Sequence, residues 1–224
     1  DWGEAPDVSF FVGRAHELAT LSHWILQDNS RLVGLLGMGG IGKTTLAAKL
    51  VQQLQDNFEI VVWRSLRNAP SLETLLTQWM PLLSYQQDVR PRLDALLQHL
   101  RAHKCLLVLD NLETILHPQP LGSFRTGYED YEQLLQMVGE TPHQSCLIIT
   151  SREKPEVLAI QEGAALAVRS LIVPGMETEA TALMTAKGLA GSTADCQTLI
   201  ATYGGNPLAL KIAATSIQDL FDGN

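Results

Sequence analysis

The sequence is poor in cysteine and in basic residues, and both shortages exclude classes of function. Its three cysteines, Cys105, Cys146 and Cys196, are odd in number and too widely spaced for a zinc site or a disulfide framework. We therefore expect buried, reduced thiols in a cytoplasmic protein. The 16 Lys and Arg residues are outnumbered by 24 Asp and Glu, giving a net charge of −8. Without a basic cluster to neutralise phosphates, nucleic acid is not expected as the main ligand.

The chain also lacks an apolar stretch of about 20 residues, the length needed to cross a membrane as a helix. Its longest apolar runs, such as 105–109, have the length of strands. No charged and then apolar leader is apparent, so we expect neither a membrane nor secretion. The apolar fraction of 46% and the 224 residues suit one α/β domain with a smaller satellite.

Strand-like and helix-like patterns alternate up to about residue 173, which predicts a parallel sheet flanked by helices. Buried strands are predicted at 31–37, 58–63, 105–110, 146–150 and 166–171, and helices at 45–55, 71–83 and from Pro91 onward. Beyond Pro174 only helices are predicted, at 176–187, 193–203 and 207–221. We expect an α/β nucleotide-binding domain over 1–173 and a small all-helical subdomain over 174–224.

A complete phosphate-binding pattern, G-x-x-x-x-G-K-[ST], is formed by Gly37, Met38, Gly39, Gly40, Ile41, Gly42, Lys43 and Thr44. Its glycines let the backbone wrap around phosphate and direct N–H groups at the oxygens, and the positive end of the helix that begins at Lys43 adds to the attraction. We expect Lys43 to reach the β- and γ-phosphates, Thr44 to ligate Mg²⁺, and Thr45 to lie near the α-phosphate. The pattern predicts a P-loop NTPase fold.

Asp110 ends the third predicted strand, where a Walker B carboxylate would hold a Mg²⁺-bound water. Many ATPases carry a second acid at the next position, but here it is Asn111, whose amide cannot accept a proton from water. Glu113 is a substitute if the backbone turns it inward; its other interpretation is a solvated loop acid. We therefore expect at most a weak, slow ATPase.

Arg152 follows the fourth predicted strand. An arginine at the end of a buried strand can contact a γ-phosphate and report whether it is present. A surface arginine in a salt bridge is the other interpretation. The candidate catalytic residues are thus Lys43, Asp110, Asn111, Glu113 and Arg152.

In their order, these segments resemble the NB-ARC family of STAND NTPases, the plant disease-resistance and apoptosome-type switches. Residues 10–14, FFVGR, are similar to the family's N-terminal motif, and 148–152, IITSR, to its sensor strand. Residues 204–210, GGNPLAL, resemble the Gly-x-Pro-Leu-Ala motif of its helical subdomain. The resemblance implies an adenine pocket lined by Val12, Gly13, Arg14, Pro207 and Leu208. Taken alone, Pro207 would be only a helix start.

The resemblance covers almost the whole chain from Val8 and points to cyanobacterial-type members in which this module precedes WD repeats. It implies a signalling switch in which ATP or ADP, bound with Mg²⁺, controls opening and self-oligomerisation of the full-length protein. An unknown ligand would act through a C-terminal region. Adenine is further implied because no Asn-Lys-x-Asp guanine motif occurs. Asn111 departs from the second acid of plant members, and the family's winged-helix subdomain lies outside this sequence.

Two other functions are left open. A working ATPase of the AAA+ type would use hydrolysis to remodel a partner; Asn111 counts against it. A small-molecule or nucleotide kinase needs an acceptor pocket and an arginine-rich lid, for which only the turn-rich stretch at 118–127 has room. The sequence does not name the activating signal, the effector or the oligomer size.

Overall fold

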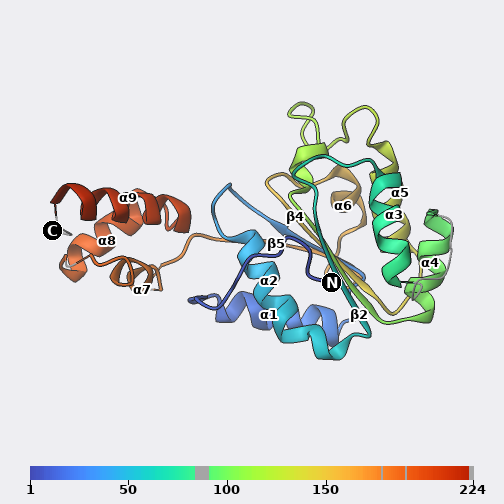
Figure 1. Cartoon of the computed structure of the whole chain (residues 1–224), viewed down its shortest axis with the longest axis horizontal. Coiled ribbons are helices and arrows are strands. Elements are labelled where there is room, and N and C mark those ends of the chain that lie inside the picture. The colour runs from blue at the N-terminus through green and yellow to red at the C-terminus, as the bar shows by residue number, and fades with distance from the viewer. Residues whose placement is uncertain (84–90, 178, 190, 222–224) are drawn as a thin grey trace.

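A five-stranded parallel sheet forms the centre of the computed structural model, which describes residues 1–83, 91–177, 179–189 and 191–221 (Figure 1). The strands are β1 (Leu32–Leu36), β2 (Ile60–Ser65), β3 (Cys105–Asp110), β4 (Cys146–Ser151) and β5 (Val168–Ile172). Their order is β2-β3-β4-β1-β5, and all neighbours pair in parallel. The carboxyl ends of β1, β3 and β4 therefore meet at one edge, which is where parallel sheets bind ligands.

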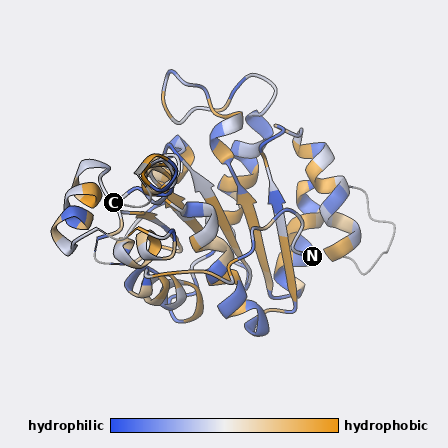
Figure 2. Cartoon of the chain, turned by 60° about the vertical axis from the view of Figure 1, so that its left-hand side comes forward, coloured by the Kyte–Doolittle hydropathy of each residue, from blue (hydrophilic) through white to orange (hydrophobic). Residues whose placement is uncertain are grey.

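Helices cover both faces of the sheet. One face packs against α1 (Ala15–Leu26) and α2 (Lys43–Leu54), the other against α3 (Leu72–Leu83), α4 (Leu93–Ala102), α5 (Glu129–Glu140) and α6 (Glu156–Gln161). Short 3₁₀ turns, η1 (Gln55–Asn57) and η2 (Leu112–Ile115), follow α2 and β3. Alternate strand residues join opposite cores: Leu107 packs with the α3–α6 layer and Val108 with α1 and α2. The central strands are therefore apolar along their length (Figure 2).

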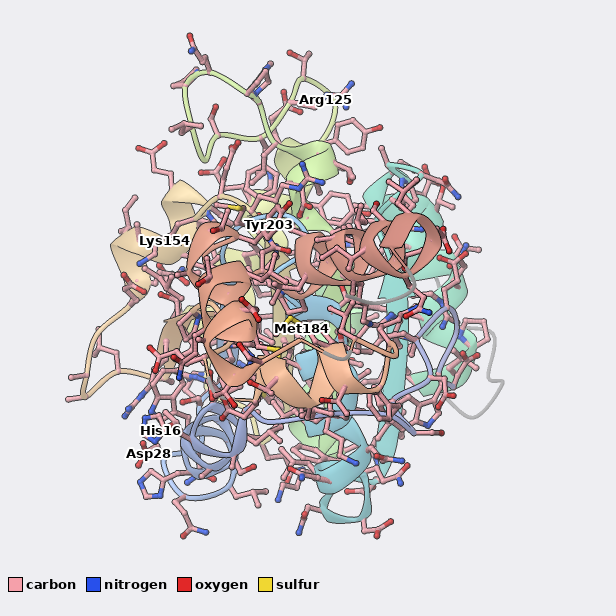
Figure 3. The ribbon with its side chains drawn as sticks, turned by 90° about the vertical axis from the view of Figure 1, so that its left-hand side faces the viewer. His16, Asp28, Arg125, Lys154, Met184 and Tyr203 are labelled. Carbon is pink, nitrogen blue, oxygen red and sulfur yellow. The ribbon has the colours of Figure 1, made fainter. Side chains whose placement is uncertain are left out.

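A separate helical unit follows β5 and lies to one side of the sheet (Figure 1). It consists of α7 (Ala180–Thr185), α8 (Thr193–Thr202) and α9 (Pro207–Phe221). Its own small core gathers around Met184, which lies between the helices in Figure 3, and includes Leu183, Cys196 and Leu210. We propose that the domain boundary falls near residue 173, directly after β5.

The predicted fold class, a P-loop-type parallel sheet flanked by helices and followed by a small helical unit, is confirmed. Several predicted bounds shift: the strand predicted at 166–171 is Val168–Ile172, and the helix predicted from Pro91 begins at Leu93. The strand predicted at 58–63 begins at Ile60, because Phe58 closes the η1 turn by donating its N–H to the Gln55 carbonyl. The helix predicted at 176–187 is α7, which is shorter, and the Met176 N–H before it donates to the Gly205 carbonyl (2.8 Å). Residues 178 and 222–224 of the predicted helical subdomain lie outside the described residues.

Three helices, α1, α5 and α6, were not predicted. The signal was present in α5, where Tyr131, Leu134, Leu135 and Val138 recur at the spacing of a buried helical face. The three cysteines are buried and unpaired. Within the described part of the chain, no helix combines the length and apolarity that a bilayer crossing requires.

Candidate nucleotide-binding site

The loop from Gly37 to Gly42 joins β1 to α2 and has a backbone that favours glycine. Gly37, Gly40 and Gly42 have φ of +142°, +77° and +98°. The Lys43 ammonium closes the loop by donating to the carbonyl oxygens of Gly37 (2.7 Å) and Met38 (3.1 Å). No side chain caps the first turn of α2, so its N–H groups are available to an anion. The loop therefore fits a phosphate.

Asp110 forms a buried hydrogen-bond network with two threonines. The hydroxyls of Thr44 and Thr150 both donate to Asp110 Oδ1, at 2.8 and 2.6 Å. Only 3% of Asp110 is exposed, and this burial raises the pKa of its carboxyl group, while the two hydroxyls act against the rise. The hydroxyl and carboxylate assigned to Mg²⁺ from the sequence are thus brought together, and both are the oxygen ligands that this ion prefers.

No group of three or more His, Cys, Asp or Glu side chains within the described ranges could hold a metal by itself. A Mg²⁺ site needs only one or two carboxylates when phosphate oxygens and waters complete it, and the Thr44 hydroxyl and Asp110 carboxylate have the chemistry of such ligands.

Glu113 turns inward rather than toward solvent. Its Oε1 lies 3.2 Å from Arg152 Nε, and its Oε2 is buried without a hydrogen-bond partner in the described structure. The local reason is Asn111, which begins η2 with a left-handed φ of +66° and donates its N–H to Thr150 Oγ1 (3.0 Å). The Asn111 side chain accepts a hydrogen bond from Ser65 Oγ (3.4 Å) and is therefore engaged within the sheet edge.

Arg152 forms a salt bridge with Glu113 and also lines the polar side of the site, while its contact with a γ-phosphate stays a prediction. Its side chain is 64% exposed and lies over the loop: a Cβ on Gly39 would be 3.2 Å from its Cζ. Burial lowers the pKa of Lys43 and Arg152 lowers it further, whereas Glu113 and Asp110 raise it. The polar end of the site therefore holds two basic side chains, Lys43 and Arg152, beside two acidic ones, Glu113 and Asp110.

Two cavities meet over the loop. One is mainly apolar and is lined by Phe10, Phe11, Val12, Arg14, Ile41, Gly42, Thr45, Met176, Leu183, Pro207 and Lys211. The other is polar and is lined by Gly39, Gly40, Gly42, Lys43, Thr44, Thr45, Asn111, Glu113, Arg152, Pro207, Leu208 and Lys211. Because four residues belong to both, a ligand that spans the pair would meet apolar groups at one end and polar, charged groups at the other.

Four predicted site residues do not line these cavities. Gly37 and Met38 contribute carbonyl groups to Lys43, and the Met38 side chain is 71% exposed. Asp110 lies behind Thr44. Gly13 packs against the helical unit, since a Cβ there would be 2.8 Å from Glu179 Cβ.

The buried Arg14 links the N-terminal motif to the loop. It donates to Glu17 Oε1 (2.8 Å) and to the Ile41 carbonyl (3.2 Å). Its backbone has a left-handed φ of +64°, directly before α1 begins. The motif at 10–14 thus reaches the site, although the sequence did not predict the helix that follows it.

Asn206 joins α9 to the loop and was not predicted as a site residue. Its Nδ2 donates to the Gly39 carbonyl (3.0 Å), while its Oδ1 caps α9 by accepting from Leu208 N (3.1 Å) and Ala209 N (3.2 Å). Leu208 N also lies 3.3 Å from the Gly40 carbonyl. Sequence reasoning recognised Asn206 only as a helix cap; Thr150 and Lys211 are two further site residues that it missed.

The predicted loop at 118–127 is confirmed as irregular apart from a bridge between Leu116 and Phe124. Its single arginine, Arg125, is labelled in Figure 3. It donates to the Thr114 carbonyl (2.9 Å), and its guanidinium lies over the Tyr128 ring. The arginine-rich lid that a kinase would need is therefore not formed by this loop.

Sequence comparison agrees with the resemblance noted above. The family model of the NB-ARC domain matches residues 14–155. An uncharacterized WD repeat-containing protein of the cyanobacterium Nostoc sp. is 51% identical over an alignment that spans 100% of this chain and 19% of that protein. A disease resistance protein of Arabidopsis thaliana is 36% identical over 28% of this chain and 7% of that protein. The chain thus spans only a small part of these relatives.

Solved structures show the same fold at low sequence identity. The Walker-type ATPase of Pyrococcus abyssi superposes with a TM-score of 0.65 and 12% identity, covering 93% of this chain and 68% of that one. The ORC2 protein of Aeropyrum pernix, solved as ADPNP–ADP complexes, gives 0.56 and 20%, covering 97% and 64%. At these identities the likeness concerns the fold alone.

Thr150→Val should destabilise the protein by about 1–3 kcal/mol, because it leaves the buried Asp110 carboxylate and the Asn111 N–H short of a partner. Urea unfolding would measure the difference. Thr198→Val makes the same chemical change on an exposed helix face and should cost less than about 0.5 kcal/mol. Equal costs for the two variants would contradict the network.

Proposed function

The chain belongs to the NB-ARC family, and on that premise we propose that it is an ATP- and ADP-binding molecular switch. One observation carries the proposal: the cavity is built by both units, since Asn206 and Leu208 at the start of α9 bond to the loop carbonyls of Gly39 and Gly40. A ligand in this cavity touches both units. Exchange of one ligand for another can therefore change the balance between closed and open arrangements.

Each end of the cavity suits one part of an adenine nucleotide. Val12, Arg14 and Pro207 line the apolar end, which supports a base-binding role, and the loop with Lys43 supports phosphate binding. Thr44 and Asp110 would hold Mg²⁺, which neutralises phosphate charge when bound. The adenine base, the ion and these residue roles are part of the proposal.

Arg152 is proposed to distinguish ATP from ADP. In the structure it pairs with Glu113, whose second oxygen has no partner among the described residues. Arg152 would turn from Glu113 to the terminal phosphate oxygens of ATP, and it would keep the Glu113 pair beside ADP. Glu113 can accept a proton and Asn111 cannot, so hydrolysis would be slow and would depend on an acid already engaged by arginine.

In the full-length protein, opening would lead to self-oligomerisation under the control of a ligand bound by a C-terminal region. The Nostoc relative contains WD repeats, which makes a repeat domain the proposed receptor for that ligand.

A working ATPase of the AAA+ type is the second candidate, and it is favoured by the inward position of Glu113 in the phosphate cavity. The two functions differ in turnover. A switch retains its nucleotide and hydrolyses slowly, whereas a remodelling ATPase turns over added ATP rapidly and repeatedly.

Lys43→Ala should weaken ATP and ADP binding by at least about a hundredfold, because it removes a buried charge at the proposed phosphate site. Isothermal titration calorimetry would measure both affinities. Lys49→Ala, on α2 with its ammonium bonded to Gln52, is the matched control and should bind like the wild type. Unchanged affinity in Lys43→Ala would refute the assignment of the loop.

Arg152→Ala should lower ATP affinity about tenfold more than ADP affinity, because only ATP has a γ-phosphate for Arg152 to contact. The readout is the ratio of the two dissociation constants with Mg²⁺ present. Arg92→Ala removes an exposed arginine that is paired with Asp94 and lines neither cavity, and it should leave the ratio unchanged. A ratio that also stays constant in Arg152→Ala would remove the sensor role.

A further inference from the structure

Lys211 lies where the apolar and the polar cavity meet. It follows Pro207 by four residues on α9, so the two side chains share one helix face. Both line both cavities, together with Gly42 and Thr45. Glu113 and Arg152 line only the polar cavity, and Phe11 only the apolar one. Lys211 is therefore placed beside the middle of a ligand that fills the two cavities.

The Lys211 ammonium has no ion pair and no hydrogen bond in the described part of the chain. The other cations of the site are engaged: Lys43 with loop carbonyls, Arg14 with Glu17, and Arg152 with Glu113. Lysine is a compact, strongly hydrated point charge that pairs well with phosphate. An unpaired ammonium at this place is thus available to an anionic ligand.

The start of α9 is held in place by the contacts of Asn206 with Gly39 and of Leu208 with Gly40. Gly40 fits closely, because a Cβ there would be 2.8 Å from Leu208 Cβ. Lys211 lies less than two helical turns after these contacts on α9, so the position of its backbone relative to the loop is fixed. Only two basic residues follow residue 174, Lys187 and Lys211, and Lys211 is the one that lines the two cavities.

We infer that Lys211 binds the phosphate chain of the nucleotide at its α-phosphate end, an inference that rests on the proposed function. The α-phosphate is common to ATP and ADP, so Lys211 strengthens binding of both equally. Arg152, at the far end of the polar cavity, would supply the discrimination between them. Because Lys211 belongs to α9, its contact also ties the helical unit to the α/β domain whichever nucleotide is bound.

The test compares Lys211→Met with Lys187→Met, which makes the same charge change at a residue that lines neither cavity. Affinities for ADP, ATP and adenosine would be measured by calorimetry, with adenosine in competition against ADP. Lys211→Met should weaken ADP and ATP about tenfold each, with their ratio and the adenosine affinity unchanged. Lys187→Met should bind all three like the wild type, and Lys211→Arg should regain most of the loss.

Thermal unfolding without nucleotide would show that the variants fold alike, as expected for an exposed side chain. Wild-type ADP affinity in Lys211→Met would overturn the inference and leave the proposed function standing. An altered ratio of ATP affinity to ADP affinity in this variant would overturn the α-phosphate assignment. An equal loss of ADP affinity in Lys187→Met would show that Lys211 makes no specific contact. Failure of the wild type to bind any nucleotide would overturn the proposed function itself.

Discussion

The side chain of Asn206 makes the contact on which the architecture of the site depends. One amide does two things: its oxygen caps α9, and its nitrogen donates to the carbonyl of Gly39 in the loop. A buried amide that lost either partner would carry an unmet hydrogen bond. The geometry of the loop and the position of the helical unit are consequently linked through a residue that is 7% exposed. The bond from Leu208 N to the Gly40 carbonyl (3.3 Å) adds to this link, so a change in the loop is felt directly at α9.

The chemistry of the site follows from how the strand ends are ordered. β1 lies next to β4, and β4 next to β3, so the loop, Arg152 and Asp110 come from three adjacent strands. Thr150 connects β4 to β3, since its hydroxyl donates to Asp110 and accepts a hydrogen bond from the Asn111 N–H. The strained backbone at Asn111 then directs Glu113 toward Arg152. Glu113, two residues after Asn111, is the proposed substitute for the second acid, and it is already paired with Arg152.

The sequence allowed the P-loop, the strand that ends in Asp110 and the class of fold to be predicted, because each depends on local pattern. Glycines that need positive φ and a strand before a helix can be recognised within about ten residues. Contacts between distant segments were beyond that reasoning. Asn206 and Gly39 are 167 residues apart, and Thr150 becomes a site residue only when β4 is known to lie beside β3. The helices α1 and α5 do carry a local signal, since their buried apolar residues recur at helical spacing.

The central claim is that this chain holds an adenine nucleotide between its two units and releases it slowly. The most direct measurement is to denature the purified protein by heat and to identify the released nucleotide by anion-exchange chromatography, with ATP turnover measured on the undenatured sample. We expect ADP in a stoichiometric amount and slow turnover. A guanine nucleotide, or an empty site that rapidly turns over added ATP, would contradict it.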